Sequence, residues 1–325
     1  MNILWIANDN CANNPNTIVS SINELTEHTA ELIMSKKNYL HYPNGTMIND
    51  VTVHEFVAKI SRATVIHLNE PVCSGQYPPE AGQRFKDSEK RVLLWDLIRK
   101  KRVIFRHSNG TYGRNNYPEI NSQCIKMNIH QTVSTPDLLK LLTGARWLPQ
   151  PTDLDNAGHA FGPAPYDEKR IIISHSPTDR YFKTTDYFLS VIRDLQSEGH
   201  PIEVRLVEGK THAQCMAIRR GAHIHFDQFM LGAYGRAAVE GLAMGQIVVV
   251  GLANIIEYVP DHPFVPANYF SLKTSILRAI SILKKKRGPW LANGRAWVEH
   301  HHDRKRVVKN LLLMYEQARK KRCKK

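Results

Sequence analysis

Several motifs that mark common classes of α/β protein are missing from this sequence of 325 residues. The loop at residues 8–16, NDNCANNPN, follows the first apolar segment and contains no glycine. A dinucleotide-binding fold needs glycines there so that the backbone can approach a pyrophosphate, which argues against a nicotinamide-dependent dehydrogenase. The sequence also has no GxxxxGKS or GxxxxGKT motif, which excludes a P-loop nucleotide hydrolase, and it has no GxSxG motif.

Cysteine is scarce, and long apolar runs are absent. No apolar run approaches the ~18 residues of a membrane span. The first ten residues, MNILWIANDN, lack a basic region followed by an apolar one, so we expect no secretory signal. We predict a reducing cytoplasm as the location, a host cytoplasm if the protein is viral. The five cysteines are odd in number and too scattered for a CxxC metal site or a disulfide framework; they are Cys11, Cys73, Cys124, Cys215 and Cys323.

Positive charge is in excess and is concentrated at one end of the chain. The net charge is +14 at pH 7, and residues 284–325 hold 15 of the 44 Lys and Arg but only 3 of the 30 Asp and Glu. The rest of the chain is therefore nearly neutral. A basic end of this kind favours a polyanionic partner, either nucleic acid or an anionic membrane surface. The alternative is a solvated tail that keeps the protein soluble.

Short apolar segments alternate with amphipathic segments in two blocks, which predicts parallel βαβ units and an α/β fold. Residues 149–168 interrupt the alternation with a Pro- and Gly-rich composition typical of a linker. We therefore predict a first domain over residues 1–150, a linker over 151–168, a second domain over 169–290 and a basic helix or tail over 291–325. The predicted strands are residues 2–7, 31–34, 64–68, 102–106, 170–174, 202–207, 223–226 and 247–250, and the predicted helices are residues 17–26, 52–61, 84–100, 184–197, 212–219 and 236–244.

The most informative segment is DQFMLGAYGRAAVEGLAMGQIVVVG, residues 227–251. A helix is predicted directly after Gly235, and the free N–H groups of a helix start bind anions. Glu240 follows one turn later as a lone acid among apolar residues. It either balances Arg236 as a partly exposed i, i+4 partner or accepts hydrogen bonds from the vicinal hydroxyls of a ribose.

A second segment, SHSPTDRYFKTTD at residues 174–186, carries Arg180 and Lys183 just beyond a predicted strand. The planar fork of an arginine and the point charge of a lysine suit a diphosphate, although two basic residues in a surface loop are the plainer interpretation. Together with Gly235 and Glu240, they supply the cations, helix start and carboxylate that a nucleoside diphosphate requires.

The C-terminal part contains two other groups of residues with alternative interpretations. His300 to His302 resemble a metal cluster, but consecutive helical positions do not share one face, so we predict solvated surface histidines. Trp290, Trp297 and the apolar run 311–314 either anchor the protein at a membrane interface or form the packing face of a terminal helix.

These motifs resemble those of the GT-B glycosyltransferases that make up retaining family 4. HSPTDRYFKTTDYFLSVIRDL resembles the family's strand, basic loop and helix, with Lys183 at the position of its diphosphate lysine. Residues 227–251 resemble its aromatic-Gly turn, helix and glutamate. RHSNGTYGR, residues 106–114, resembles its His-Gly loop, and residues 133–154 are similar to the segment that ends its first domain.

The sequence departs from the family pattern in two places. The family usually carries two glutamates that flank seven residues; Glu240 fills the second position, but Gly232 occupies the first. Asp227 is a candidate to compensate for the missing acid. The Asn-rich loop at residues 8–16 also replaces the family's Gly-rich loop.

The resemblance implies a GT-B fold, in which two Rossmann-like doubly wound domains face each other across a cleft. It implies sugar transfer, with retention, from a nucleotide-diphosphate donor, for which we take UDP-glucose, to an acceptor hydroxyl. No metal and no further cofactor is implied, because protein cations and helix dipoles bind the diphosphate. We predict the catalytic residues His107 and Asn109, the donor-binding residues His175, Arg180, Lys183, Lys210, Tyr234, Gly235, Arg236 and Glu240, and the acceptor-binding residues Asn10, Asn13, His67, Glu70 and Arg114.

The sequence leaves three alternatives open for the acceptor and the activity. The first is a hydroxymethylated base in DNA, as for a phage DNA-modifying glycosyltransferase, with the basic C-terminal region as the DNA contact. The second is a polysaccharide or lipid-linked acceptor at a membrane, where the basic region meets anionic headgroups. The third is a non-catalytic nucleotide- or DNA-binding protein that shares the fold. Nothing in the sequence predicts an oligomeric state.

Overall fold

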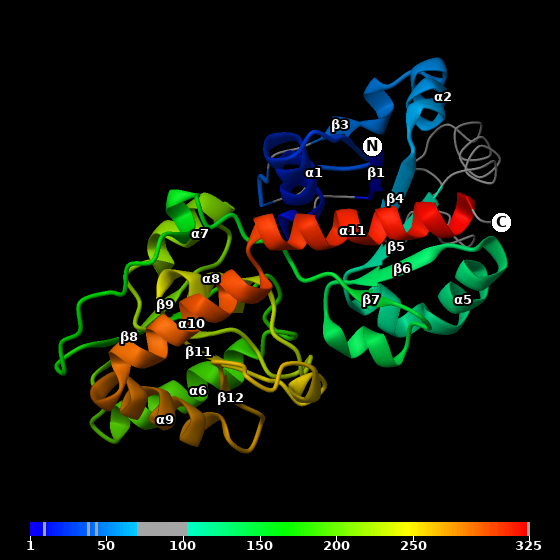
Figure 1. Ribbon diagram of the computed structural model, residues 1–325. Helices are drawn as coiled ribbons and strands as arrows, with labels where there is room; N and C mark the ends of the chain where they lie inside the picture. Colours follow the sequence, from blue (N-terminus) through cyan, green and yellow to red (C-terminus); the bar gives the residue numbers. More distant parts are fainter. Residues whose placement is uncertain (9–10, 38–39, 43–44, 70–102, 324–325) are drawn as a thin grey trace. The chain divides into compact units, whose positions relative to one another are not determined.

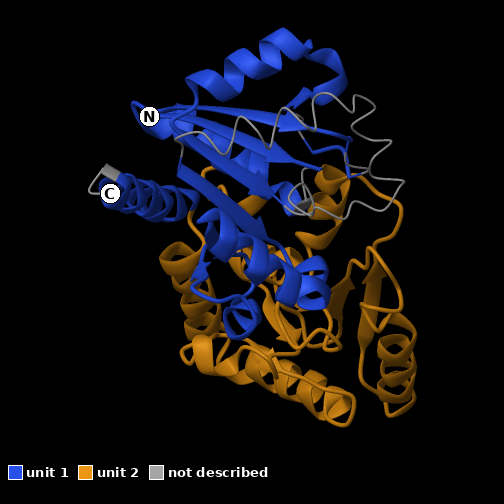
Figure 2. Ribbon diagram, turned by 90° about the vertical axis from the view of Figure 1, so that its right-hand side faces the viewer, with its two compact units in different colours: residues 1–151, 304–325 blue, residues 152–303 orange. Residues whose placement is uncertain are grey.

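The computed structural model describes residues 1–8, 11–37, 40–42, 45–69 and 103–323. The chain forms two compact units, unit 1 with residues 1–151 and 304–325, and unit 2 with residues 152–303 (Figure 2). The chain enters unit 2 after Pro151 and returns after Asp303, so helix α11, Arg304–Cys323, belongs to unit 1 (Figure 1). The predicted helix at residues 84–100 lies outside the described residues.

Unit 1 is built on a seven-stranded parallel sheet with the order β3-β2-β1-β4-β5-β6-β7. This order reverses direction beside β1, as in other doubly wound sheets. The strands are β1 Asn2–Ala7, β2 Thr29–Met34, β3 Thr46–Met47, β4 Val65–Asn69, β5 Val103–Ser108, β6 His130–Val133 and β7 Arg146–Trp147, and the helices are α1 Asn14–Leu25, α2 Val53–Arg62, α5 Thr111–Met127 and α11.

Helices cover both faces of this sheet, because the side chains of a strand point alternately to its two faces. On β1, Leu4 and Ile6 pack with residues of α2 and α5. Ile3 and Trp5 point the other way and pack with residues of α1 and α11. The C-terminal helix therefore completes the hydrophobic core of the unit in which the chain begins.

Unit 2 has a five-stranded parallel sheet with the order β12-β11-β10-β8-β9. One face packs against helices α6 and α9, and α8 and α10 lie against each other beside the sheet (Figure 1). The strands are β8 Ile171–His175, β9 Ile202–Leu206, β10 Ile224–Phe226, β11 Ile247–Val250 and β12 Val265–Pro266, and the helices are α6 Thr185–Ser197, α7 His212–Arg219, α8 Arg236–Met244, α9 Leu272–Lys285 and α10 Arg287–His301.

The local structure around α8 follows directly from its sequence. Gly245 ends the helix with a left-handed φ of 84°, which glycine adopts without strain. The four residues of β11, IVVV, are fully buried, as expected for an interior strand of a parallel sheet. Gly241 lies so close to β11 that an added Cβ would stand 3.0 Å from Val248. The small residues of α8 therefore allow the helix to approach the sheet closely.

The predicted α/β class with two parallel sheets is confirmed. The elements β3, α5, β6, β7, β12 and α9 were not predicted from the sequence. In α5, Pro118 and the non-helical residue Asn116 interrupt the helical pattern. Within the described parts of the chain, no helix combines the length and apolar character that a membrane crossing requires.

Candidate functional site

The carboxyl edge of the sheet in unit 2 holds a cluster of charged groups around the start of α8. Asp227 follows β10, and its Oδ2 accepts the backbone N–H of Gly235, which caps α8, at 2.8 Å. Its Oδ1 accepts a hydrogen bond from Nζ of Lys183, which lies in the loop after β8. Asp227 is almost fully buried. Two donors from separate loops thus converge on one anionic group at a helix N-terminus.

Arg180 lies in the same loop, but its guanidinium is directed to other partners. Nη1 donates to both carboxylate oxygens of Glu208 at 2.9 and 3.0 Å, and Nη2 donates to Asp186. These two acids raise the pKa of Arg180, which stays a cation. Arg180 is about half exposed at the edge of the sheet, where its charge is balanced by surface acids.

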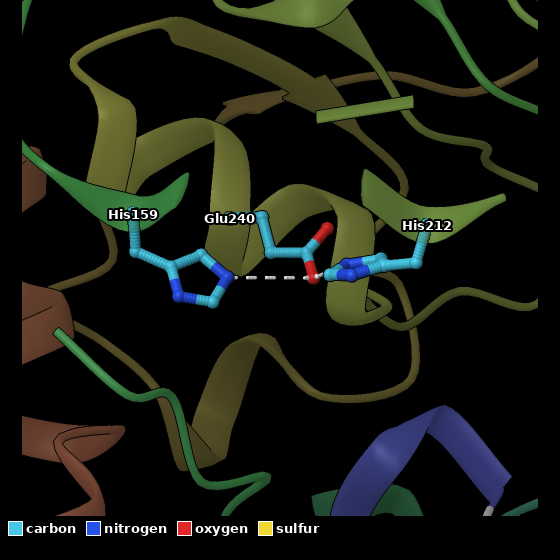
Figure 3. A group of neighbouring side chains, drawn as sticks. All are labelled: His159, His212 and Glu240. Carbon is cyan, nitrogen blue, oxygen red and sulfur yellow. Dashed lines mark hydrogen bonds and ion pairs between the residues drawn. The ribbon is translucent and has the colours of Figure 1, made fainter. Parts of the chain in front are cut away.

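Glu240 is the centre of a second, buried cluster (Figure 3). Its Oε1 accepts hydrogen bonds from Arg236 Nε at 2.8 Å and His212 Nε2 at 2.7 Å, and its Oε2 accepts one from Arg219 Nη1 at 3.1 Å. Nε2 of His159 lies 3.8 Å from Oε1. The prediction of a partly exposed acid is wrong, because the side chain is 3% exposed, although the i, i+4 pair with Arg236 is present.

The charge state of Glu240 follows from these neighbours. Burial alone would raise the pKa of its carboxyl group, but the imidazoles of His159 and His212 and the guanidinium of Arg236 outweigh burial and hold the pKa well below its usual value. The carboxylate is therefore ionised. In this structure three protein donors take three of the about four acceptor positions of the carboxylate, so a ribose hydroxyl would use the remaining position or replace one of these donors.

The same cluster has the ligand atoms of a metal site, but positively charged side chains surround it. His159, His212 and Glu240 each offer a ligand atom, and these atoms lie within 4.8 Å of one another. However, Arg219 and Arg236 donate directly to the carboxylate. A divalent cation would stand beside two guanidinium groups, so the arrangement suits a hydrogen-bonded carboxylate better than a metal.

Of three other predicted donor-binding residues, two have buried hydrogen-bond partners of their own and one is exposed. His175 is fully buried between Phe226 O and Thr185 Oγ1, both at 2.9 Å, and burial lowers its pKa to about 4. The hydroxyl of Tyr234 is buried and lies 3.1 Å from a ring nitrogen of His302. Lys210 is exposed in the turn between β9 and α7. The other predicted donor-binding residues that come together form two pairs. Lys183 and Gly235 both contact Asp227, and Arg236 contacts Glu240.

In unit 1 the two predicted histidines are buried rather than presented to a ligand. His107 lies at the end of β5 with Nδ1 2.9 Å from Thr132 Oγ1 and Nε2 2.7 Å from Ser134 Oγ. His67 on β4 has both ring nitrogens within hydrogen-bond distance of Tyr315 and Thr132. A strand buried on both faces gives no pattern that distinguishes an inward histidine from a ligand-facing one.

The remaining predicted residues of unit 1 that the structure describes are Asn13, Asn109 and Arg114. Asn109 is half-buried just after β5, and its Oδ1 accepts a hydrogen bond from Ser134. Asn13 precedes α1 with a left-handed φ of 57°. Arg114, in α5, forms a two-pronged ion pair with Asp137, at 2.6 and 3.1 Å, that ties α5 to the short 3-10 helix after β6. Asn10 and Glu70 lie outside the described residues.

The sequence matches no protein-family model and no curated protein sequence. A sucrose-phosphate synthase from Thermosynechococcus elongatus matches this structure with 13% identity and a TM-score of 0.64, covering 98% of this chain and 99% of that chain. An alpha-glucosyltransferase in complex with UDP and a 13-mer DNA containing an HMU base matches with 8% identity and a TM-score of 0.66, covering 97% and 99%. The chain has the GT-B fold.

The GT-B fold is shared by more than one kind of enzyme. A UDP-GlcNAc 2-epimerase from Neisseria meningitidis matches with 12% identity and a TM-score of 0.53, covering 98% of this chain and 100% of that chain. At these sequence identities a structural match shows the fold, whereas the reaction has to be inferred from the residues of the site. The predicted GT-B fold is confirmed, and membership of retaining family 4 stays a prediction.

Three residues of the cluster around Glu240 were not predicted from the sequence. His212 and Arg219 stand seven positions apart on α7, a spacing that places both on one helix face, and this signal was available in the sequence. His159 lies in the Pro- and Gly-rich segment, where no periodicity points to it. Its position beside Glu240 results from a turn, Ala157–His159, that only the fold reveals.

Some side chains of the C-terminal residues are buried, and others are exposed to solvent. His302 is fully buried under Trp297, with ring centroids 5.1 Å apart, so the prediction of solvated surface is wrong for this histidine because the end of α10 turns it inward. Trp297 and Leu311 are buried in separate cores. They therefore pack within the protein, which is the alternative to an anchor at a membrane interface. The exposed cations are Lys284, Lys285 and Lys286 in unit 2 and Lys305, Arg306, Lys309, Arg319, Lys320, Lys321 and Arg322 on α11 in unit 1.

Proposed function

We propose that this GT-B protein is a glycosyltransferase that moves a sugar from a nucleotide-diphosphate donor to an acceptor hydroxyl. The observation that carries the proposal is the convergence of Lys183 and the Gly235 N–H on one anionic group at the start of α8. Ligands of open α/β sheets bind at the carboxyl ends of the strands, and helix N-termini bind phosphates. A diphosphate oxygen would receive the donors that Asp227 receives in this structure.

The chemistry of the leaving group follows from the same donors. Negative charge develops on the diphosphate as the bond to the anomeric carbon breaks. A lysine ammonium and an oriented backbone N–H stabilise that charge without a metal ion. Glu240, ionised and held by two arginines, is the proposed partner of the ribose hydroxyls. Retention at the anomeric carbon, with the leaving phosphate taking the acceptor proton, completes the proposal.

A hydroxymethylated base in DNA is our proposed acceptor, and UDP-glucose our proposed donor. Two observations support DNA. One structural neighbour was solved with UDP and a DNA that contains an HMU base. In addition, ten exposed lysines and arginines lie between residues 284 and 322 of this chain. Exposed cations gain affinity for the phosphate backbone by releasing its counterions.

The membrane-acceptor alternative has less support from the structure. Interfacial helices present apolar or aromatic residues beside their cations. Here Trp297 is buried and Trp290 packs partly against the core of unit 2. On α11, Leu313 is exposed, at 47%, whereas Leu311 and Tyr315 are buried. An exposed face that is mostly basic favours a polyanion in solution over a bilayer surface.

The test is transfer of radiolabelled glucose from UDP-glucose to defined acceptors. DNA with hydroxymethylcytosine or hydroxymethyluracil should become labelled, and unmodified DNA and lipid extracts should not. Lys183→Gln should lose most of the transfer, whereas Lys273→Gln, which removes an exposed cation paired with Glu198, should keep it. Absence of label in every acceptor with several nucleotide sugars would exclude a glycosyltransferase. Conversion of UDP-GlcNAc to its 2-epimer without transfer would instead assign epimerase chemistry.

Salt dependence tests the DNA contact separately. A phosphate contact adds about −0.9 to the slope of log affinity against log salt concentration. The triple variant Lys320→Gln/Lys321→Gln/Arg322→Gln should therefore have a shallower slope, by up to about 2.7, if all three cations touch phosphates. An affinity that hardly changes between about 50 and 200 mM salt would argue against the basic region as a DNA contact.

A further inference from the structure

One ring nitrogen beside Glu240 in unit 2 is buried and has no hydrogen-bond partner. His159 lies in the turn Ala157–His159, and its side chain is 6% exposed. Within the part of the chain that the structure describes, no group forms a hydrogen bond with its Nε2. This nitrogen faces Oε1 of Glu240 from 3.8 Å (Figure 3). A buried polar atom without a partner is unfavourable, so it calls for an explanation, and contact with a ligand is one.

The other ring nitrogen of His159 fixes where its proton lies. Nδ1 stands 2.8 Å from the backbone oxygen of Asp153, which can only accept, so Nδ1 carries the proton. Nε2 of the neutral ring is then an acceptor. A protonated Nε2 would form a charge-assisted hydrogen bond with the Glu240 carboxylate, and such bonds are about 2.7–2.9 Å long. The separation of 3.8 Å is instead that of two acceptors.

Glu240 has acceptor capacity left on one of its two oxygens. Arg236 and His212 both donate to Oε1, whereas Arg219 alone donates to Oε2. A carboxylate oxygen accepts about two hydrogen bonds, so Oε2 can take one more donor. Two acceptors of one buried cluster, Oε2 of Glu240 and Nε2 of His159, are therefore still open.

The charges of this cluster restrict what can bind to the two open acceptors. A cation is disfavoured because the guanidinium groups of Arg219 and Arg236 stand beside the carboxylate. An anion is disfavoured by the ionised carboxylate of Glu240 itself. A neutral group with two neighbouring donors remains, and a vicinal diol is such a group, because each hydroxyl donates one hydrogen bond.

The position of the cluster on α8 suits the diol of a ribose. Glu240 follows Gly235 by five residues on one helix, which is about 7.5 Å along the helix axis. Gly235 lies at the end of α8 where we propose that the diphosphate binds. A ribose that is joined to this diphosphate would therefore reach the level of Glu240. His212, at 23%, is the most exposed side chain that contacts Glu240, so the cluster is nearest to solvent on its side.

We propose that His159 is a binding residue for the nucleotide, and that its Nε2 accepts one of the two ribose hydroxyls while Glu240 accepts the other. This inference rests on the proposed glycosyltransferase function. The imidazole is held in place for this task, because Nδ1 donates to Asp153 and Arg295 donates to the backbone oxygen of His159 at 2.9 Å. A nucleotide that lacks either hydroxyl leaves one buried acceptor without a donor. The pair of acceptors thus selects ribonucleotides over deoxyribonucleotides.

Calorimetric titration with UDP, 2′-deoxy-UDP and 3′-deoxy-UDP tests this assignment. The unmodified protein should bind UDP about five- to tenfold more tightly than either deoxynucleotide, the effect of one hydrogen bond. His159→Phe should weaken UDP binding by a similar factor. It should also weaken binding of the deoxynucleotide that keeps the hydroxyl bound by His159, and leave the other deoxynucleotide unaffected. His200→Phe, in the turn before β9, is the control and should leave all three affinities unchanged.

The pattern of losses separates this inference from the proposed function. Equal losses for all three nucleotides in His159→Phe, or no loss for UDP, would overturn the role of His159 and leave the proposed function standing. The expected pattern in a protein that transfers no sugar would contradict the proposed function while the ribose contact stands. Failure to bind any of the three nucleotides would contradict both.

Nitrogen NMR of the His159 ring tests the inference on the unmodified protein. The ring signals are identified by their loss in His159→Phe. Without nucleotide, Nε2 should give the signal of an unprotonated nitrogen, and UDP should shift it towards that of a hydrogen-bonded acceptor. A protonated Nε2, or a signal that UDP does not move, would refute the contact even if His159→Phe does not fold.

Discussion

The carboxylate of Asp227 accepts the backbone N–H of Gly235 at 2.8 Å, at the start of α8. Lys183 donates to the other oxygen of the same carboxylate. An acidic side chain from the loop after β10 thus holds the two donors that we assign to the diphosphate. Binding of the nucleotide sugar is expected to displace this carboxylate or to rearrange it. Asp227 therefore competes with the diphosphate for the same two hydrogen-bond donors.

Asp227→Asn should strengthen nucleotide binding. It should also lower the unfolding free energy of the protein without nucleotide. The carboxamide can still accept the Gly235 N–H, but it no longer neutralises Lys183, whose side chain is 16% exposed. Loss of one member of a buried ion pair costs about 3 kcal/mol of unfolding free energy, and UDP should recover part of it. Calorimetric titration and thermal unfolding with and without UDP measure both effects. Glu198→Gln, in an exposed pair with Lys273, is the control. Weaker UDP binding by Asp227→Asn would mean that this carboxylate itself contacts the donor.

Glu240→Gln should destabilise unit 2 strongly. It leaves Arg219 and Arg236 without the charge that both guanidinium groups contact. Breaking such a buried pair costs about 3–5 kcal/mol. The matched control is Glu299→Gln, whose i, i+4 pair with Arg295 is half exposed and should contribute about 0.5 kcal/mol or less. Urea unfolding of the two variants measures the difference. Equal losses would show that the Glu240 cluster is not structurally important.

Gly232→Ala should be destabilising, because the residue is buried in a tight turn. Gly232 has a φ of 62°, and an added Cβ would stand 2.6 Å from Asn254 Nδ2. The left-handed conformation alone costs a residue with a Cβ about 1–2 kcal/mol. Gly288→Ala is the control, because no atom lies within 4 Å of its added Cβ. Thermal unfolding should separate the two variants. For the same reason, Gly232→Glu should not restore the family's first glutamate at the family's geometry.

Acid should destabilise the protein through its buried histidines. The pKa is about 3 for His107 and about 4 for His175, and burial also lowers those of His67 and His225. The unfolded chain therefore binds protons that the folded chain does not, and stability falls as the pH drops below 6.5 towards these values. Each such histidine should contribute about 1.4 kcal/mol per pH unit in that range. Urea unfolding at pH 7.5, 6.5 and 5.5 measures the slope. A stability that is flat over this range would contradict the assignment of neutral, buried rings.

The periodicity of apolar residues and the turn residues were sufficient to predict most of the fold. The β11 strand, the start of α8 after Gly235 and its end at Gly245 were predicted at the residues where the structure has them. These features depend on local rules: apolar runs, helix caps and the left-handed freedom of glycine. The α5 helix was missed because Pro118 lies inside it. Local patterns therefore fail where a helix is stabilised by its packing rather than by its sequence.

The site was predicted less completely, because its contacts join distant parts of the chain. Lys183 and Gly235 were correctly associated, since both follow strands of one parallel sheet and must meet at its carboxyl edge. Nothing local indicated that Asp227 would stand between them. His67 and His107 were assigned to a ligand, but both strands are buried on two faces, and the partner of His67 is Tyr315, on the last helix.

The sequence by itself determined the α/β class, the position of a helix start suited to a phosphate and the basic character of the C-terminal end, because each depends on residue types within one segment. Only the tertiary structure decided which polar groups meet. It placed α11 in unit 1, gave Glu240 its two arginines and two histidines, and brought Tyr315 to His67. A hydrogen bond needs its two atoms about 3 Å apart, and only folding brings atoms from distant segments to that distance.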